Sequence, residues 1–302
     1  MKFGGHETFP VREGWLHKGL KLVVEEPEKL VDEHVADWLG VGRNMAKSIR
    51  FWLQATGLCE QVSGKRPRKS AQLKTTRLGR LIWERDPYFT DTGTWWALHV
   101  NLISREEHAF TWDWFFNRFK LQRFDKAVCV EGLQRFLQMH RGRMPSPRTL
   151  DRDVSCLLLS YSKSIPDREV DPEEAQESPF TELGLLSHYR TSGYYEVDQG
   201  TKAIPAHILC YSLTRAFGDD AHDGPIQASV QESSHRRGGP GNAFCMSAED
   251  LYEAAIQAED EQVGLEIHGL AGQRNLVVER REETNWLDEY FTHAGSEGLH
   301  AA

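Results

Sequence analysis

The chain has 302 residues, of which 39% are hydrophobic and 27% charged, and its formal net charge is −9. This length suits one large or two modest domains with a sizeable core. The sequence has no apolar run near the ~18 residues that span a bilayer, and residues 1–10 lack the apolar segment of a secretion signal. We therefore expect a cytoplasmic protein without a membrane partner.

The five cysteines, Cys59, Cys129, Cys156, Cys210 and Cys245, lie far apart, and none belongs to a Cys-x-x-Cys pair. This spacing argues against a disulfide framework and against a cysteine zinc site. We expect reduced thiols that pack as small hydrophobic side chains.

Charge is distributed unevenly along the chain. Residues 1–155 carry 26 Lys and Arg against 19 Asp and Glu, a net charge of +7, whereas residues 156–302 carry 10 against 26, a net charge of −16. Residues 39–85 hold 11 basic and two acidic residues. A solvated charged face is one interpretation, but so one-sided a run repels itself unless it meets an anion. The segment therefore predicts contact with the phosphates of double-stranded DNA.

The basic segment has the pattern of a helix-turn-helix. Residues 30–39 and 43–56 show helical apolar spacing, and Gly40-Val41-Gly42 between them predicts a tight turn. Residue types that contact base edges and phosphates are predicted on or near the outward side of the second helix. These candidates are Arg43, Asn44, Lys47, Ser48 and Arg50.

A hairpin is predicted next, with strands at residues 58–62 and 71–75 and a closing helix at 77–84. Such a hairpin after a helix-turn-helix is the wing of a winged helix, placed to contact a neighbouring phosphate or the minor groove. The tip carries Lys65, Arg66, Arg68 and Lys69. A wing that mediates only protein contacts is the alternative.

The remaining pattern is mostly helical, at residues 109–124, 127–139, 151–161 and from a capping box at Ser247 and Asp250 to about residue 258. Short strands are predicted at 194–197 and 275–279. We predict a mainly α fold with small β elements, comprising an N-terminal winged helix-turn-helix domain and a helical C-terminal lobe. The predicted domains are a winged-helix domain at 1–105, a helical connecting segment at 106–166 and an acidic helical domain at 167–302.

Two segments hold candidate catalytic residues. His6 and Glu7 follow two glycines and suit a metal ligand or general base beside a phosphate, or a capping segment that satisfies buried backbone groups. Asp86, Asp91 and His99 have the side chains that metal-assisted phosphodiester hydrolysis needs. Alternatively, Asp91 caps a helix and His99 is a core histidine. The metal ligands are not identified, and no Walker A loop, His-Glu-x-x-His or standard nuclease signature is present.

Four segments together resemble a bacterial family of proteins of unknown function encoded beside DNA phosphorothioation and phage-defence genes. They are residues 4–19, 77–102, 178–186 and 200–213, and the most specific part is DPYFTDTGTWWALH at residues 86–99. The resemblance implies a site-selective DNA nicking endonuclease that uses Mg²⁺ or Mn²⁺. It also implies three partners, namely a cysteine desulfurase, an ATPase and a sulfur-transfer enzyme of the PAPS-reductase type.

Two functions therefore remain open. The resemblance favours a metal-dependent nickase in phosphorothioate modification and phage defence. The missing nuclease signature favours a non-enzymatic winged-helix DNA-binding adaptor or regulator that recruits partner proteins through its acidic lobe. The apolar helical faces of that lobe are compatible with a homodimer as well as with a core of its own.

Overall fold

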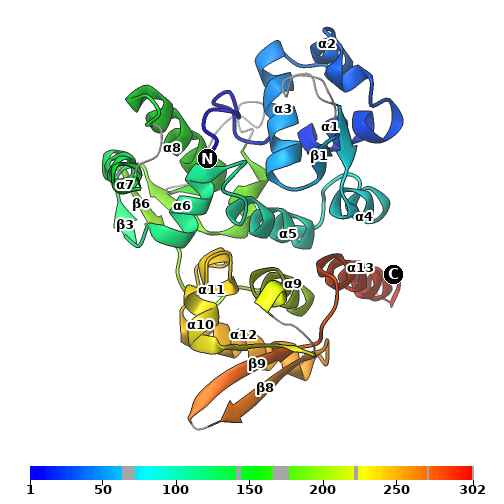
Figure 1. Cartoon of the computed structure of the whole chain (residues 1–302), viewed down its shortest axis with the longest axis vertical. Coiled ribbons are helices and arrows are strands. Elements are labelled where there is room, and N and C mark those ends of the chain that lie inside the picture. Colours follow the sequence, from blue (N-terminus) through cyan, green and yellow to red (C-terminus); the bar gives the residue numbers. More distant parts are fainter. Residues whose placement is uncertain (63–71, 141–143, 166–176, 221–223, 271, 301–302) are drawn as a thin grey trace. The chain divides into compact units, whose positions relative to one another are not determined.

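The computed structural model shows two compact units, Met1–Asp198 and Gln199–Ala302, and Figure 1 labels many of their helices and strands. The structure describes residues 1–62, 72–140, 144–165, 177–220, 224–270 and 272–300. Within these ranges, no helix combines the length and the apolar character that crossing a membrane requires.

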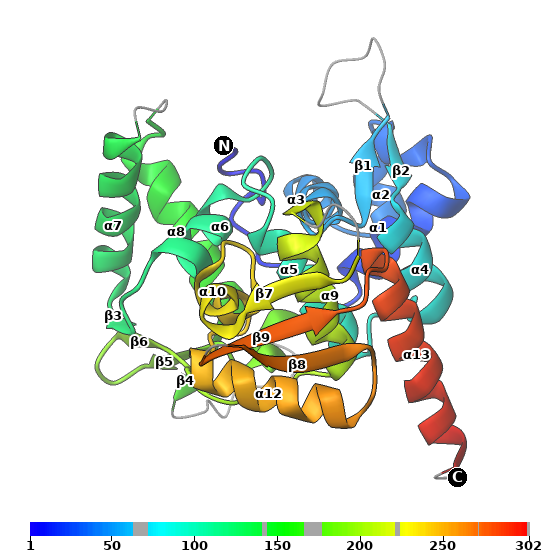
Figure 2. The same ribbon diagram turned by 60° about the horizontal axis from the view of Figure 1, so that its bottom comes forward.

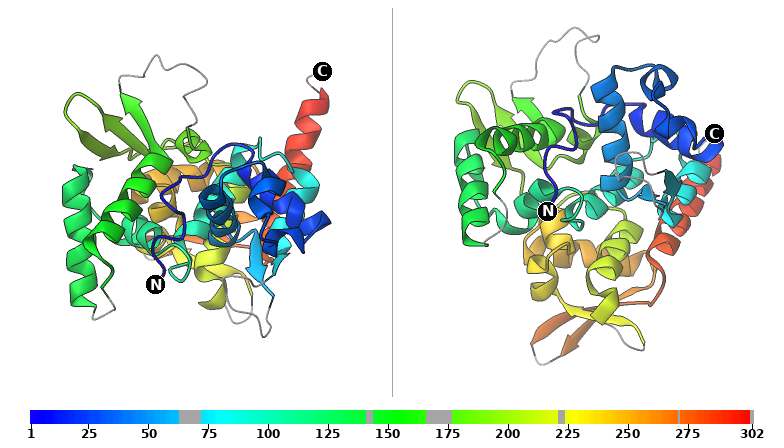
Figure 3. Two further views of the ribbon diagram at one scale, coloured as in Figure 1. Left: turned by 90° about the horizontal axis from the view of Figure 1, so that it is seen from above. Right: turned by 45° about the horizontal axis from the view of Figure 1, so that its top comes forward.

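The first unit is mainly helical. Its α-helices are α1 (Trp15–Glu25), α2 (Val35–Leu39), α3 (Arg43–Ala55), α4 (Arg77–Arg85), α5 (Thr92–Ile103), α6 (Phe110–Arg118), α7 (Lys126–Met139) and α8 (Pro147–Tyr161), and its 3₁₀ turns are η1 (Lys29–Val31) and η3 (Pro179–Leu183). Its strands are β1 (Cys59–Gln61), β2 (Leu73–Thr75), β3 (Arg123–Phe124), β4 (Ser162–Ile165), β5 (Leu186–Tyr189) and β6 (Tyr194–Val197). Helices α7 and α8 lie side by side, as Figure 3 shows from two further directions.

Two small sheets belong to this unit. Strands β1 and β2 pair antiparallel, with Cys59 opposite Thr75, which confirms the predicted hairpin strands. The other sheet has the order β3-β6-β5-β4. Its central strands β5 and β6 are antiparallel, and β4 joins parallel to β5.

Helix α5 forms the centre of the core. Every residue from Gly93 to Ile103 is buried, as expected for a helix whose residues are mostly apolar all the way round. Around it lies an aromatic cluster in which the Trp52 and Trp112 rings meet edge to face at 5.5 Å. Phe180 stacks on Tyr161 at 5.1 Å and contacts Trp52 at 6.3 Å.

That cluster joins parts of the chain that the sequence pattern assigned to three separate domains. Trp52, Trp112 and Phe180 come from the predicted segments 1–105, 106–166 and 167–302, respectively. The boundary between the compact units instead follows Asp198. The difference arises because the side chains that complete the first core lie far beyond its helix-turn-helix pattern.

The helix predicted over residues 30–39 is interrupted. Its first part is the turn η1, and α2 begins only at Val35. The Asp32 carboxylate accepts a hydrogen bond from the His34 backbone N–H at 2.7 Å, a local bond that competes with helix formation. Trp38, one of the apolar residues within the predicted range 30–39, is 52% exposed.

Helix α4 is held tightly against the hairpin. Thr76 caps it by accepting from the Gly79 N–H at 3.0 Å and donates its own hydroxyl to the Gly57 carbonyl at 2.6 Å. A Cβ on Gly79 would lie 2.1 Å from the Leu58 carbonyl oxygen. Only glycine therefore permits this approach of helix to strand.

The second unit combines helices with a small sheet, in which the strand Gln273–Val278 confirms the short strand predicted at 275–279. Its helices are α9 (Ala206–Phe217), α10 (Val230–His235), α11 (Pro240–Ala243), α12 (Ala248–Asp260) and α13 (Glu283–His300), with the 3₁₀ turn η4 (Gly218–Asp220). Its strands β7 (Ile226–Ser229), β8 (Leu265–Leu270) and β9 (Gln273–Val278) form an antiparallel sheet in the order β7-β9-β8. Figure 2 shows α12 along β8. The capping box predicted at Ser247 and Asp250 is present.

Candidate functional site

The outward side of α3 carries part of the predicted DNA-contacting set. Arg43, Asn44 and Lys47 are exposed near the start of the helix. The Lys47 ammonium donates to the Asn44 side-chain oxygen at 3.2 Å, so the two side chains lie next to each other. Exposed polar side chains near the start of a helix are the kind that recognition helices present to a nucleic-acid groove.

Two members of that set are less exposed. Ser48 is buried and donates to the Phe9 carbonyl at 3.4 Å, so it serves the packing of the chain's first residues. Arg50 is only partly exposed, and burial lowers the pKa of its guanidinium. The prediction that Ser48 lies on the outward face is therefore wrong, because the N-terminal segment covers this part of α3. The four predicted wing residues, Lys65, Arg66, Arg68 and Lys69, lie outside the described residues.

The N-terminal segment lies against α3. The indole N–H of Trp52 donates to the Phe9 carbonyl at 3.1 Å, and Lys47 approaches the Glu7 carboxylate at 3.8 Å. Glu7 and Thr8 have positive φ angles of 50° and 72°, a conformation that surrounding contacts must hold in place. A predicted catalytic residue, Glu7, is thus brought beside a predicted DNA-contacting residue, Lys47.

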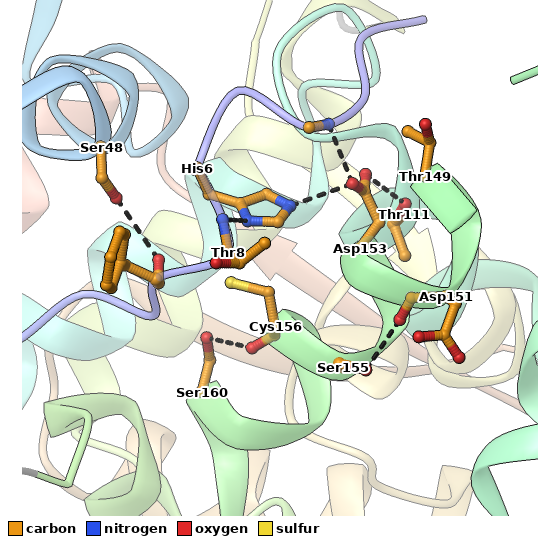
Figure 4. A network of polar contacts seen from close by, with 12 residues as sticks. His6, Thr8, Ser48, Thr111, Thr149, Asp151, Asp153, Ser155, Cys156 and Ser160 are labelled. Carbon is orange, nitrogen blue, oxygen red and sulfur yellow. Dashed lines mark hydrogen bonds and ion pairs between the residues drawn. The ribbon is translucent and has the colours of Figure 1, made fainter. Parts of the chain in front are cut away.

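His6 is buried and paired with Asp153 of α8. Its Nε2 lies 3.0 Å from Asp153 Oδ1, and its Nδ1 accepts a hydrogen bond from the Thr8 N–H at 3.0 Å. Asp153 also accepts from the Gly4 N–H at 2.8 Å and from the Thr111 hydroxyl at 3.1 Å. Figure 4 shows this network joining the N-terminal segment to α8 and to Thr111.

The bonding pattern indicates what this pair does. Because Nδ1 of His6 accepts a hydrogen bond, the proton of a neutral imidazole sits on Nε2 and is donated to Asp153. Three donors then compensate the buried carboxylate of Asp153, as burial of a charge requires. His6 is 1% exposed. The geometry of His6 therefore fits the interpretation as a capping segment better than the interpretation as a catalytic base.

Asp86 and Asp91 organise the turn between α4 and α5. Asp86 is buried and accepts four hydrogen bonds, from the Thr90 N–H and hydroxyl, the Asp91 N–H and the Thr94 hydroxyl. Asp91 is the N-cap of α5 and accepts from the Gly93 N–H at 2.7 Å. This confirms the helix-cap interpretation of Asp91.

His99 lies in the core on α5. It is fully buried, and its Nδ1 lies 2.7 Å from the Tyr161 hydroxyl. Its ring also meets that of Phe116 edge to face, with centroids 4.7 Å apart. These surroundings match the interpretation of His99 as a core histidine.

These residues do not fit a preformed magnesium site. Magnesium prefers carboxylate and water oxygens, but the oxygens of Asp86 and Asp153 already accept hydrogen bonds from the protein. Among the described residues, no group of three or more His, Cys, Asp or Glu is arranged to hold a metal ion. The carboxylates of Asp86 and Asp153 therefore serve as hydrogen-bond acceptors within the fold.

Asp153 is the member of this network that the sequence pattern did not single out. It follows Leu150 by three residues and precedes Leu157 by four, so it occupies an inward position of an amphipathic helix. A carboxylate among apolar residues at core spacing signals a buried polar partner. The identity of that partner, 147 residues away, has no local signal.

Several arginines of the second unit are paired with local carboxylates. Arg215 pairs with Glu283 at 2.7 Å, and Arg236 pairs with Asp220. Arg274 pairs with Glu249 at 3.1 Å. These pairs leave the exposed side of α3 as the better supported candidate for contact with phosphate.

The cysteines match the sequence-based expectation. All five are thiols, and four of them are buried. Burial raises the pKa of Cys59, Cys129 and Cys210 to about 12. They stay protonated at neutral pH and are poor nucleophiles.

Comparison with known proteins gives one family and one group of solved structures. A family model described as "Protein of unknown function (DUF4007)" matches residues 3–291. Two similar crystal structures are of SspB, one of them magnesium ion-bound. Each is 26% identical, has a TM-score of 0.85, and matches 96% of this chain and 88% of the SspB chain. No curated protein matches the chain. The resemblance noted from the sequence is thus confirmed, and the chain belongs to the DUF4007 family of proteins of unknown function.

Proposed function

We propose that this protein binds double-stranded DNA and nicks one strand with a divalent metal ion, within bacterial phosphorothioate modification and phage defence. The observation that carries the proposal is the similarity to SspB over 96% of the chain. The magnesium ion in one SspB structure supports Mg²⁺ or Mn²⁺ as the cofactor. A phosphorothioation context follows from the family resemblance of the four sequence segments.

The proposed DNA-binding element is a winged helix built from α2, α3, the β1–β2 hairpin and α4. Its support is the order of these elements, the antiparallel pairing of the hairpin and the exposed Arg43, Asn44 and Lys47 on α3. In this proposal α3 enters the major groove, and the segment between β1 and β2 follows the neighbouring phosphates.

A second function, that of a non-enzymatic adaptor, is favoured by one observation. The candidate catalytic side chains of Asp86, His99 and His6 are all engaged in bonds that shape the protein. The second unit has 7 Lys and Arg against 17 Asp and Glu, a net charge of −10, which suits protein partners better than DNA. Those partners would be the desulfurase, the ATPase and the PAPS-reductase-type enzyme, or a second copy of this chain.

Supercoiled plasmid separates the two functions. A nickase converts it to open circles with Mg²⁺ or Mn²⁺ and leaves it intact with a chelator. A gel-shift titration on the same DNA measures binding in parallel. If the protein binds the DNA but forms no open circles with either metal, the nickase proposal is wrong and the adaptor proposal stands. If the protein does not bind the DNA, both proposals are wrong.

The wing has its own test. Replacing its four basic residues together by alanine, at Lys65, Arg66, Arg68 and Lys69, should weaken binding to all DNA sequences. The slope of log affinity against log salt should flatten by about 0.9 for each phosphate that the variant no longer neutralises. An unchanged slope would place the phosphate-binding side chains elsewhere.

A further inference from the structure

Three aromatic rings are stacked at the surface of the first unit. They come from His17 on α1, Trp83 on α4 and Tyr88 in the turn that follows α4. The His17 and Tyr88 rings are 4.8 Å apart and inclined by 23°, and the His17 and Trp83 rings are 5.8 Å apart and inclined by 22°. His17 is therefore the middle ring, and Tyr88 is the outer one.

The outer face of Tyr88 is open to solvent. The side chain is 67% exposed, more than any other tyrosine, phenylalanine or tryptophan of the described chain, although one face of its ring is covered by His17. Such exposure contributes little to folding, because the apolar ring stays in water. The stack thus ends in an unoccupied aromatic face.

The stack is held rigidly. Its middle ring is oriented by the His17 Nδ1–H, which donates to the Pro87 carbonyl at 2.8 Å. The Tyr88 backbone lies between Asp86, with its four hydrogen bonds, and Phe89, which is buried at φ 58°. The Trp95 indole N–H donates to the Phe89 carbonyl at 2.9 Å. A ring presented in this way loses little conformational freedom when it binds a ligand.

Charged side chains of both signs lie beside Trp83, at the other end of the stack from Tyr88. Trp83 also lines a groove of about 410 Å³ between α1, β2 and α4, together with Arg80, Lys74 and Glu84. Arg80 is exposed, and Lys74 is paired with Glu60 at 3.1 Å at the surface. An exposed aromatic ring and an exposed cation such as Arg80 on the same unit are the side chains that hold a nucleic-acid strand whose bases are unpaired.

We propose that Tyr88 stacks an unpaired nucleobase of a DNA strand, with the adjoining phosphates directed toward Arg80. The proposal rests on the proposed function, because it assumes that the protein binds DNA. It adds a site outside the predicted DNA-contacting residues of α3 and a preference for a base that has left the helical stack. A strand-cleaving protein gains access to a phosphodiester when neighbouring bases are unstacked, and an aromatic platform compensates for the stacking that those bases give up.

The test uses two DNA duplexes of the same sequence that carry 2-aminopurine, one with this base paired and one with it in a single-nucleotide bulge. Wild-type protein should bind the bulged duplex more tightly and quench its fluorescence through stacking. Tyr88→Ala should weaken binding to the bulged duplex by about 5- to 100-fold and abolish the quenching. Its affinity for the paired duplex should stay within about two-fold, because the contacts of α3 are intact.

Three further variants sharpen the result. Tyr88→Phe keeps the aromatic face and should behave as wild type, whereas His17→Ala removes the ring below Tyr88 and should have an intermediate effect. Tyr194→Ala on β6 removes another exposed tyrosine (41% exposed) and should change nothing. Thermal unfolding of each variant verifies its fold.

The outcomes are distinguishable. If Tyr88→Ala binds and quenches the bulged duplex like wild type, the stacking site is wrong while DNA binding stands. The stacking site is also wrong if wild-type protein binds the paired and bulged duplexes with equal affinity and does not quench the bulged one. If wild-type protein binds neither duplex, the proposed function itself fails, and the stacking site fails with it.

Discussion

Polar side chains of the first unit are used in opposite ways at two places that adjoin each other. On the outward side of α3, Arg43 and Lys47 are exposed. A short distance along the packed N-terminal segment, His6 and Asp153 are buried and bonded to each other and to the backbone. The comparison teaches that residue type alone does not reveal a site. A charged group that is buried with all its partners supports the fold, and one that is exposed on a rigid helix is available to a ligand.

The largest change in stability should come from the buried hydrogen-bond network around Asp153. Asp153→Ala leaves the His6 Nε2–H, the Gly4 N–H and the Thr111 hydroxyl without their acceptor. We expect the free energy of unfolding to fall by about 3 to 5 kcal/mol, measured by urea denaturation. The double variant with His6→Ala should lose less than the sum of the two single changes, since the residues act as one unit. Full additivity would contradict the network.

Changes on the exposed face of α3 should affect DNA binding and leave stability almost unchanged. Arg43→Ala combined with Lys47→Ala should change the free energy of unfolding by less than about 0.5 kcal/mol. DNA binding should weaken by roughly 1 to 3 kcal/mol for each side chain that reads a base, with altered site preference. Gel-shift titrations over several DNA sequences measure the affinity and the site preference.

A matched pair of exposed cations controls for net charge. Arg135 on α7 and Lys163 on β4 are also exposed, and their combined replacement by alanine removes the same charge. DNA affinity should fall far less in this variant. Equal losses in the two double variants would mean that overall charge, and not the face of α3, determines binding.

The smallest change in stability should come from a side chain that is neither fully buried, like His6 and Asp153, nor fully exposed. His188 on β5 is partly buried and stacked on Tyr195 at 4.2 Å. Burial, and then the charge of Arg190, lowers the pKa of His188. The folded protein therefore binds fewer protons here than the unfolded chain, so stability falls as the pH drops below the ordinary histidine value of about 6.5.

His188→Gln tests this direction. Urea midpoints measured between pH 7.5 and pH 5 should decline less steeply in the variant than in wild type. Burial also lowers the pKa of His108 and His207, so part of the decline should remain. An identical slope in the two proteins would show that His188 does not contribute.

Local features of the fold were predictable from the sequence because they depend on neighbours a few residues apart. The capping box at Ser247 and the N-cap at Asp91 follow from side chains that bond to the next turn of their own helix. The paired strands β1 and β2 follow from apolar alternation around a polar tip. Helix α3 begins at the predicted residue, Arg43, because the preceding glycines break the earlier helix.

The sequence by itself therefore determined the mainly helical class, the positions of several helices and strands, the thiol state of the cysteines and the family resemblance. Only the tertiary structure decided how the chemistry-bearing residues are used. It paired His6 with an aspartate 147 residues away, buried Ser48 beneath the N-terminal segment, and stacked Tyr88 on a histidine from α1. The physical reason is that periodicity records which side of an element faces the core, whereas partners are chosen by packing between elements distant in the chain.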